Sequence, residues 1–191
     1  MVARRRMAVN GEARRDTLID AAEALLIEEG AAALTARKIT ERSGMKSQLI
    51  YYYFETMDDL ILAVLNRVNL RRRLRLEEAC QADSPLDALW TANIDTQNSI
   101  ISSELIALAS HRESVREAIT SQAAELRERQ VSAVSAIMSK RGYDIERYPA
   151  EAVVMIATAL ARAIVAEQAL GLTYCHEEAI RIVAQALETL R

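Results

Sequence analysis

Apolar residues recur at helical spacing along most of the chain and divide it into a series of predicted helices. The first runs over about 12–29 and ends at Gly30, because glycine commonly follows a helix. Its apolar side chains repeat every three or four positions, as on one face of a helix: Leu18, Ala21, Ala22, Leu25 and Leu26.

The stretch 34–54 predicts two short helices joined by a tight turn. Thr35 is a candidate N-cap, because its hydroxyl can accept a hydrogen bond from a backbone N–H one turn later. Gly44 stops the first helix, since glycine tolerates the left-handed backbone that a helix end often needs. In the second helix Ile50 and Phe54 lie four residues apart, so both can face the interior.

Further helices follow to the end of the chain. Thr56 caps a fourth helix, and Ser84 followed by Pro85 marks the clearest break, because proline is favoured at the first helical position. The remaining helices are predicted over 86–110, 113–119, 121–141, 149–170 and 176–190.

Composition supports an all-α fold. Apolar residues make up 51% of the chain but aromatic residues only 4%, and there are only five Gly and two Pro. A sequence with so few strand-forming and helix-breaking residues favours helices throughout. At 191 residues the chain can also bury a core without disulfides.

Charge and cysteine content narrow the functional class. The formal net charge of −3 argues against a wholly basic nucleic-acid-binding surface, but the field that matters is the local one at a contacting face. Cys80 and Cys175 have no metal-binding spacing, so no metal is predicted and a reducing cytoplasm is the expected location. The apolar stretch 150–172 carries charges and is predicted to be a buried helix, not a membrane span. Basic residues cluster before residue 50: Arg4, Arg5, Arg6, Arg14, Arg15, Arg37, Lys38, Arg42 and Lys46.

The second helix of the short pair carries hydrogen-bonding side chains on its outer faces. Tyr51, Tyr52 and Tyr53 cannot all be core residues, and their hydroxyls can donate to phosphates. Gln48 has the amide group that can read adenine in the major groove. These side chains favour DNA binding, whereas spacing alone leaves an ordinary helical hairpin with a solvated face as the alternative.

The N-terminal part of the chain resembles the DNA-binding domain of the tetracycline-repressor (TetR) family of transcriptional regulators. It departs from the family pattern at Met57, where the family usually has a phosphate-binding lysine, and at Gln48, where the family usually has a small residue. The matching residues agree in order, spacing and type across three helices: Leu18, Ala21, Ala22, Leu25, Leu26, Gly30, Leu34, Thr35, Ile39, Ser43, Gly44, Met45, Ile50, Tyr51, Tyr52, Tyr53, Phe54, Leu60, Ala63 and Val64.

The resemblance and the chain pattern together predict three parts. A flexible basic arm at 1–11 either reaches along DNA or is a solvated tail, and both readings stay open. A helix-turn-helix DNA-binding domain of three helices spans 12–72, and a helical regulatory, effector-binding and dimerisation domain spans 73–191. The predicted DNA-contact residues are Thr35, Ala36, Arg37, Lys46, Ser47, Gln48, Leu49, Tyr51, Tyr52 and Tyr53.

By the same resemblance the protein is expected to be a homodimeric repressor. Its partners would be double-stranded operator DNA and a small apolar or amphipathic effector that releases it from the operator. A two-fold DNA-binding protein needs two recognition helices one helical turn apart, so geometry also favours a dimer.

A stripe of mixed apolar and polar residues on the predicted 86–110 helix is the candidate effector site. Met138 and Met155 form the opposite wall in this prediction, because methionine fills irregular spaces. Arg162 either meets an effector carboxylate or, as the favoured alternative, pairs with an acid such as Glu167 or reaches solvent. The stripe consists of Trp90, Asn93, Ile94, Gln97, Ile101 and Leu105.

The last two predicted helices are rich in small and apolar residues and can form half of a four-helix dimer interface. The alternative is that both helices are simply core of one subunit. The predicted interface residues are Val153, Ala157, Leu160, Ile164, Ile180, Val183 and Leu187.

No catalytic residue and no cofactor are predicted, so the chain is not expected to be an enzyme. Cys175 and His176 are neighbours in sequence, but neighbours rarely point at each other and no third orienting group follows them. A helical-bundle enzyme or binding protein with an unrecognised pocket and no DNA role is the alternative.

Overall fold

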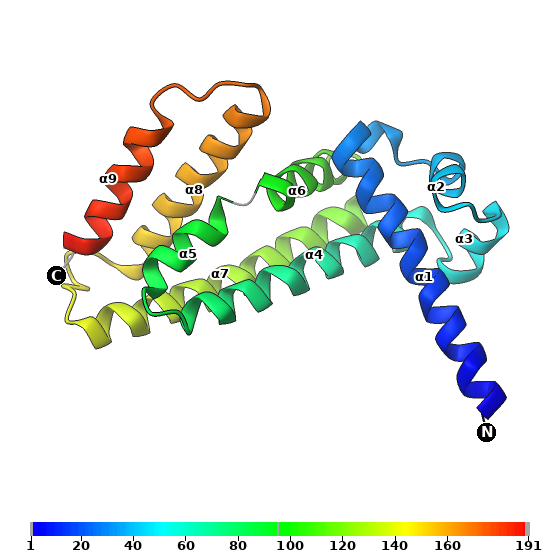
Figure 1. The fold of residues 1–191 in the computed structure, drawn as a ribbon, viewed down its shortest axis with the longest axis horizontal. Helices are drawn as coiled ribbons and strands as arrows, with labels where there is room; N and C mark the ends of the chain where they lie inside the picture. Colours follow the sequence, from blue (N-terminus) through cyan, green and yellow to red (C-terminus); the bar gives the residue numbers. More distant parts are fainter. Residues whose placement is uncertain (1, 95, 190–191) are drawn as a thin grey trace. The chain divides into compact units, whose positions relative to one another are not determined.

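In the computed structural model, all the secondary structure in the described part of the chain is helical (Figure 1), which confirms the all-α prediction. The structure describes the backbone of residues 2–94 and 96–189 and the side chains of residues 11–94 and 99–186. Within these ranges no helix is long and apolar enough to cross a membrane. The elements in order are α1 (Val2–Glu29), the 3-10 helix η1 (Ala31–Ala33), α2 (Ala36–Ser43), α3 (Ser47–Tyr53), α4 (Met57–Cys80), α5 (Pro85–Asn93), α6 (Thr96–Ala109), α7 (Glu113–Arg141), α8 (Ala150–Ala169) and α9 (His176–Thr189).

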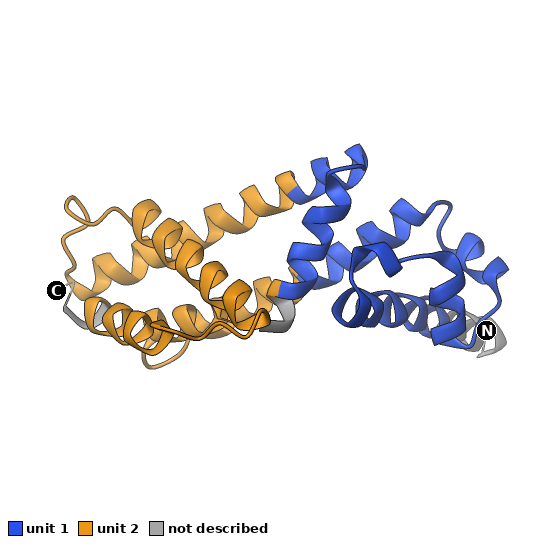
Figure 2. Cartoon of the chain, turned by 90° about the horizontal axis from the view of Figure 1, so that it is seen from above, with its two compact units in different colours: residues 1–68, 100–119 blue, residues 69–99, 120–191 orange. Residues whose placement is uncertain are grey.

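Two compact units make up the chain (Figure 2). Unit 1 comprises Met1–Val68 together with Ile100–Ile119, and unit 2 comprises Asn69–Ser99 together with Thr120–Arg191. Unit 1 therefore includes most of α6 and the start of α7, which the sequence pattern assigned to the C-terminal domain at 73–191.

A single apolar core holds unit 1 together. Helix α6 joins this core because Ile101 and Leu105, one turn apart, are both almost fully buried in it. Burying one such aliphatic side chain contributes about 1.5–3 kcal/mol, so several helices with matching apolar faces suffice to hold the unit. Large side chains that are fully buried in this core include Leu18, Leu25, Leu26, Ile39, Ile50, Leu60, Ile61, Val64, Val68 and Leu105.

Helix α1 begins at Val2, well before the predicted start near residue 12. Residues 2–11 are therefore helical where the sequence pattern predicted a flexible arm. The segment has no proline, and a single Gly11 inside a helix costs only about 1 kcal/mol relative to alanine. Contact of this segment with DNA stays a prediction.

The predicted single helix over 86–110 is wrong, because α5 ends at Asn93 and α6 starts at Thr96. At the end of α5 the Asn93 side-chain amide donates to the Leu89 carbonyl at 3.0 Å. The Ile94 N–H donates to the Thr91 carbonyl, which is only three residues earlier in the chain. A side chain that bonds the local backbone competes with helix continuation. Conversely, the predicted helices 113–119 and 121–141 form one helix, α7, because Thr120 and Ser121 do not interrupt it.

Unit 2 packs its helices around two apolar clusters. One cluster surrounds the fully buried Met138 of α7, and the other joins Trp90 of α5 to Ala161 and Ile164 of α8. Helix α9 contributes Ile180 and Val183 to the second cluster.

Candidate functional site

The turn between α2 and α3 is built by local capping, as predicted. The Thr35 hydroxyl accepts a hydrogen bond from the Lys38 N–H at 3.3 Å, which satisfies a free donor at the start of α2. Gly44 then adopts a left-handed backbone with φ of 68° and ends α2, and α3 begins at Ser47. The short spacing between these two caps sets the position of α3.

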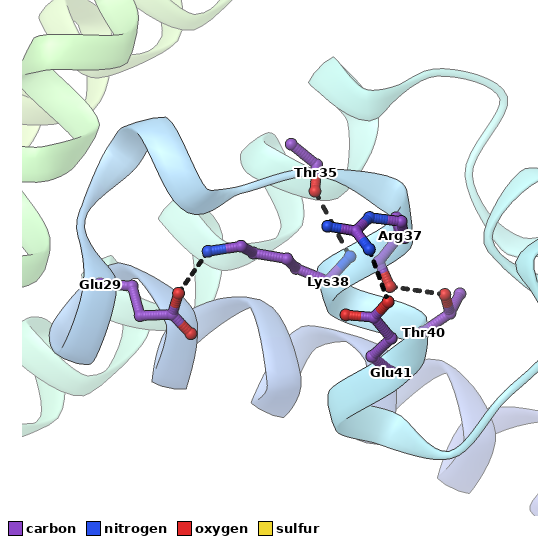
Figure 3. Close-up of polar contacts among 6 residues, drawn as sticks. All are labelled: Glu29, Thr35, Arg37, Lys38, Thr40 and Glu41. Carbon is purple, nitrogen blue, oxygen red and sulfur yellow. Dashed lines mark hydrogen bonds and ion pairs between the residues drawn. The ribbon is translucent and has the colours of Figure 1, made fainter.

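Polar contacts on the outer side of α2 tie it to the end of α1 (Figure 3). Lys38 forms an ion pair with Glu29 of α1, and the Thr40 hydroxyl donates to the Arg37 carbonyl at 2.8 Å. Arg37 pairs with Glu41 one turn later at 3.1 Å, and both side chains are mostly exposed. Exposed pairs of this kind contribute little to stability, so the Arg37 guanidinium can exchange Glu41 for another anion.

Helix α3 is anchored by one face and presents the others to solvent. Ile50 and Phe54 are buried in the core of unit 1, as predicted from their spacing. Tyr51 and Tyr52 are 57% and 77% exposed, and Gln48 is also exposed. Large exposed tyrosines on a firmly anchored helix are typical of a contact surface.

Tyr53 differs from its two neighbours because its ring is half-buried against the core of unit 1. The Tyr52 ring meets it edge-on, with ring centroids 4.9 Å apart and planes at 86°. Tyr53 therefore helps to orient Tyr52. Among the other predicted DNA-contact residues, Ala36 and Leu49 are half-buried, and the exposed ones are Thr35, Arg37, Lys46 and Ser47.

The start of α4 is held by a capping pair of residues and by contacts with Arg112 and Ser114 at the beginning of α7. Thr56 and Asp59 cap each other, since the Thr56 N–H donates to the Asp59 carboxylate at 2.8 Å and the Asp59 N–H donates to the Thr56 hydroxyl at 3.2 Å. The Asp58 carboxylate accepts from the Ser114 hydroxyl at 2.6 Å and forms an ion pair with Arg112. These contacts lower the pKa of Asp58, the Ser114 hydrogen bond most, against the opposing effect of partial burial.

A hydrogen bond joins α6 to the segment between α1 and α2. The Glu104 carboxylate accepts a hydrogen bond from the Ala31 N–H at 2.6 Å, directly after Gly30. Gly30 has φ of 79°, and a Cβ built there would lie 3.2 Å from the Glu104 carboxylate oxygen. The left-handed backbone and the close carboxylate both favour glycine at this position.

Unit 2 contains a small cavity of about 40 Å³. Its wall is largely aliphatic, with one tryptophan and three uncharged polar side chains. The lining residues are Leu86, Leu89, Trp90 and Asn93 from α5, Gln130 and Val134 from α7, and Val153, Val154, Ala157 and Thr158 from α8.

Comparison with known proteins decides the family. Residues 18–64 match the family model described as bacterial regulatory proteins, tetR family. This match covers the end of α1, all of α2 and α3 and the beginning of α4.

Residues 18–64 therefore form the N-terminal domain of a tetR-family regulatory protein.

Solved structures agree with this TetR-family fold over nearly the whole chain. A candidate TetR-family transcriptional regulator from Rhodococcus sp. aligns with a TM-score of 0.75 and 21% identity, covering 93% of this chain and 98% of that one. A TetR transcription regulator from Haloarcula marismortui aligns with a TM-score of 0.75 and 18% identity, covering 93% and 97%. A candidate transcriptional regulator from Pseudomonas aeruginosa gives 0.70 and 20%, covering 94% and 95%. No curated protein sequence matches the chain.

The predicted effector residues do not all lie together. Trp90 and Asn93 line the cavity, whereas Ile94 packs in the neighbouring cluster around Trp90. Ile101 and Leu105 are core residues of unit 1, because α5 and α6 are separate helices. The remaining three predicted residues are placed as follows: Met138 is fully buried in the α7 cluster, Met155 is 58% exposed, and the side chain of Gln97 lies outside the described residues.

The predicted dimer-interface residues mostly contact the chain's own interior. Val153 and Ala157 line the cavity, and Ile164 is buried beside Trp90. Leu160, Ile180 and Val183 pack around the same cluster, and the side chain of Leu187 lies outside the described residues. Most of these side chains are only half-buried in the single chain, so their role in an interface stays a prediction.

Sequence reasoning missed two polar residues of the cavity and two charged residues that hold unit 1 together. Gln130 and Thr158 were not predicted, although each is a polar residue on an otherwise small and apolar helical face, which is a usable signal. Glu104 and Arg112 carry no such local signal, since their partners are 73 and 54 residues away. His176, buried at the start of α9, contacts Glu167 at 2.7 Å, while its neighbour Cys175 is exposed.

Asp58→Asn is expected to remove a pH-dependent part of the stability of unit 1. The pKa of Asp58 in the folded protein lies below its ordinary value of 3.8. The contribution of Asp58 to the free energy of unfolding is therefore fully present above the unfolded-state pKa. It is lost as the pH falls through the folded-state pKa. The difference in free energy of unfolding between wild type and variant should be about 1 kcal/mol or less near pH 7, because the pair is partly exposed.

Urea unfolding between pH 2.5 and 7 measures that difference. It should be constant at neutral pH and shrink in the acid range. The control is Glu117→Gln, which changes an exposed carboxylate on α7 and should give no such trend. A wild-type–variant difference that grows on acidification would contradict the assignment.

Proposed function

We propose that this TetR-family regulator is a homodimeric repressor that binds operator DNA through α3 and is released by a small molecule held in unit 2. The observation that carries the DNA-binding part is the division of α3 into a buried and an exposed side. Ile50 and Phe54 fix the helix in the core, and Gln48, Tyr51 and Tyr52 stand outward as hydrogen-bonding groups. Such a helix can lie in a major groove with its polar side chains at base edges and phosphates.

Charged groups next to α3 suit contact with the DNA backbone. Arg37 and Lys46 are exposed, at the first turn of α2 and immediately before α3. Thr35 is exposed at the start of α2, where backbone N–H groups also favour a phosphate. Local positive charge of this kind supports DNA binding despite the negative net charge of the chain.

A second copy of the chain is the proposed partner for the outer face of α8 and α9. Ile156 of α8 and Ile182 of α9 are 67% and 61% exposed, which is unusual for isoleucine in a folded chain. Small residues lie before and after Ile156 along the same helical face and would let a partner helix approach closely, namely Ala152, Ala159, Ala163 and Ala166. This face supports a symmetric four-helix interface on the same two helices as the residues named from the sequence.

The small cavity of unit 2 is the proposed effector site. An effector can release the protein only if it binds the DNA-incompetent arrangement more tightly than the DNA-competent one. By the reciprocity of linkage, operator DNA then weakens effector binding by the same factor.

Selection from a pool of random DNA duplexes tests the proposed function. The protein should enrich a palindromic sequence whose half-sites lie about one helical turn (~34–36 Å) apart, because the two α3 helices of a symmetric dimer read equivalent half-sites. The double variant Gln48→Ala, Tyr52→Ala changes only exposed side chains and should enrich nothing while its far-ultraviolet circular dichroism stays that of wild type. Failure of the wild-type protein to enrich any sequence would refute the proposal and favour a helical binding protein without a DNA role.

A further inference from the structure

Two ion pairs join the end of α1 to α2, and their acidic partners are consecutive residues of α1. Glu29 pairs with Lys38, and Glu28 pairs with Arg42. Lys38 and Arg42 are four residues apart, so both cations project from the same side of α2. Figure 3 shows the Lys38 side chain extending across to Glu29 of α1. Helix α2 is therefore connected to α1 by charge at two points, one turn apart.

The charges at this junction oppose the local preference of both helices. A helix favours basic residues in its last turn and acidic residues in its first turn. The last turn of α1 ends in Glu28 and Glu29 and has no basic residue, whereas the first turn of α2 contains Lys38 and no acidic residue. Each helix alone would favour the opposite charge there. The Lys38–Glu29 pair therefore gains its favourable energy from the meeting of the two helices.

Helix α2 has few other contacts that fix its orientation. It is eight residues long, and Ile39 is its one buried residue. Ala36 also packs against the core of unit 1, but its side chain is small and half-buried. A rotation of α2 about Ile39 would disturb few buried contacts, whereas it would separate ion pairs that all lie on one side. Because the tight turn at Gly44 links α2 to α3, such a rotation would also move α3.

We propose that Lys38 and Arg42 are positioning residues, which fix α2 and through it α3 on the glutamates of α1 and do not bind DNA phosphates themselves. This inference rests on the proposed operator binding and deepens it, because it divides the cations of α2 by role. Arg37 differs from both, since its partner Glu41 lies on α2 itself and can be exchanged for a phosphate without releasing α2 from α1.

The size of the expected effect follows from the exposure of the two pairs. Their four side chains are 33–54% exposed, so the pairs contribute little to the free energy of unfolding. The orientation of α3 decides whether its side chains reach base edges, so the effect is expected in operator binding and not in overall stability.

Charge reversal of the Lys38–Glu29 pair tests the inference. Fluorescence anisotropy compares Glu29→Lys, Lys38→Glu and the double variant with wild type, on the selected operator and on a random duplex. Each single variant places two like charges together and should weaken operator binding by about fivefold or more. The double variant restores a pair of opposite charges and should bind the operator within about twofold of wild type.

Glu29→Lys gives the sharpest contrast between positioning and phosphate contact. It makes unit 1 more positive, which by charge alone strengthens binding to any DNA. The inference predicts weaker binding to the operator together with unchanged or tighter binding to the random duplex. The matched control is Glu117→Lys, which makes the same change of charge at an exposed residue of α7 in unit 1 and should not weaken operator binding.

Amide hydrogen exchange of the free protein is a second measurement, and it does not involve DNA. The amides of α2 should exchange faster in both single variants and return to wild-type rates in the double variant. Tighter operator binding by Glu29→Lys, or a double variant that binds as weakly as Lys38→Glu, would overturn the inference and make Lys38 a phosphate contact.

The two proposals fail in different ways. A wild-type protein that selects no operator would refute the proposed function, and the exchange rates alone would then decide whether the ion pairs hold α2. A wild-type protein that selects an operator, with all three variants binding it equally well, would refute this inference alone.

Discussion

Gln48→Ala is expected to weaken binding to the selected operator by about 1–3 kcal/mol per half-site, or about 5- to 150-fold for each. Gln48 is exposed in the first turn of α3, where its amide can pair with a base edge. The side chain is remote from the buried face of α3, so its truncation should leave the free energy of unfolding within about 0.5 kcal/mol of wild type. Fluorescence anisotropy with the operator and with random duplex of equal length measures the effect.

The pattern across sequences is the decisive part of this result. If Gln48 reads a base, its loss reduces operator affinity but hardly changes binding to random DNA, and one operator position becomes permissive. Equal loss on operator and random DNA would remove Gln48 as a base-reading residue.

Arg37→Ala supplies the contrasting case of a phosphate contact. It should weaken binding to operator and random DNA alike and reduce the slope of log affinity against log salt by about 1 per half-site. The chain offers a matched control in Arg129, which pairs with Glu125 one turn away at 3.0 Å in unit 2, as Arg37 pairs with Glu41. Arg129→Ala should leave the salt slope unchanged.

Ile156→Glu is expected to convert the dimer to folded monomers. A charge buried without a partner in a packed interface costs about 3–5 kcal/mol, which raises the dimer dissociation constant by at least about a hundredfold. Because Ile156 is 67% exposed on the single chain, the substitution should not disturb the fold of unit 2. Sedimentation equilibrium measures the assembly, and circular dichroism checks the fold.

Ile106→Glu is the control for this substitution. Ile106 is also a half-exposed isoleucine, at 54%, but it lies on α6 in unit 1. Its variant should remain dimeric. A dimer that survives Ile156→Glu at micromolar concentration would place the interface on another face.

The sequence by itself determined the local framework of the DNA-binding unit. The Thr35 cap, the left-handed Gly44 and the inward pair Ile50 and Phe54 are all correct in the structure. Each of these features depends on residues within one or two turns of one another, so a single stretch of chain contains the whole cause. The matched family motif lies in this same stretch.

Only the tertiary structure decided where one helix ends and its neighbour begins within the apolar C-terminal part. The periodic pattern over 86–110 fits one helix, but Ile101 and Leu105 are buried in unit 1 while Trp90 lines a cavity in unit 2. Which core an apolar face enters depends on the complementary faces of distant segments, and these leave no mark on the residues themselves.

The same limit applies to the two sides of α8. Val153 and Ala157 line the cavity, whereas Ile156 and Ala159 face solvent, although all four are small or aliphatic. When a helix is apolar on most of its circumference, its pattern has no preferred inward direction. The choice is made by what α5 and α7 place against the helix and is therefore a property of packing between segments far apart in the chain.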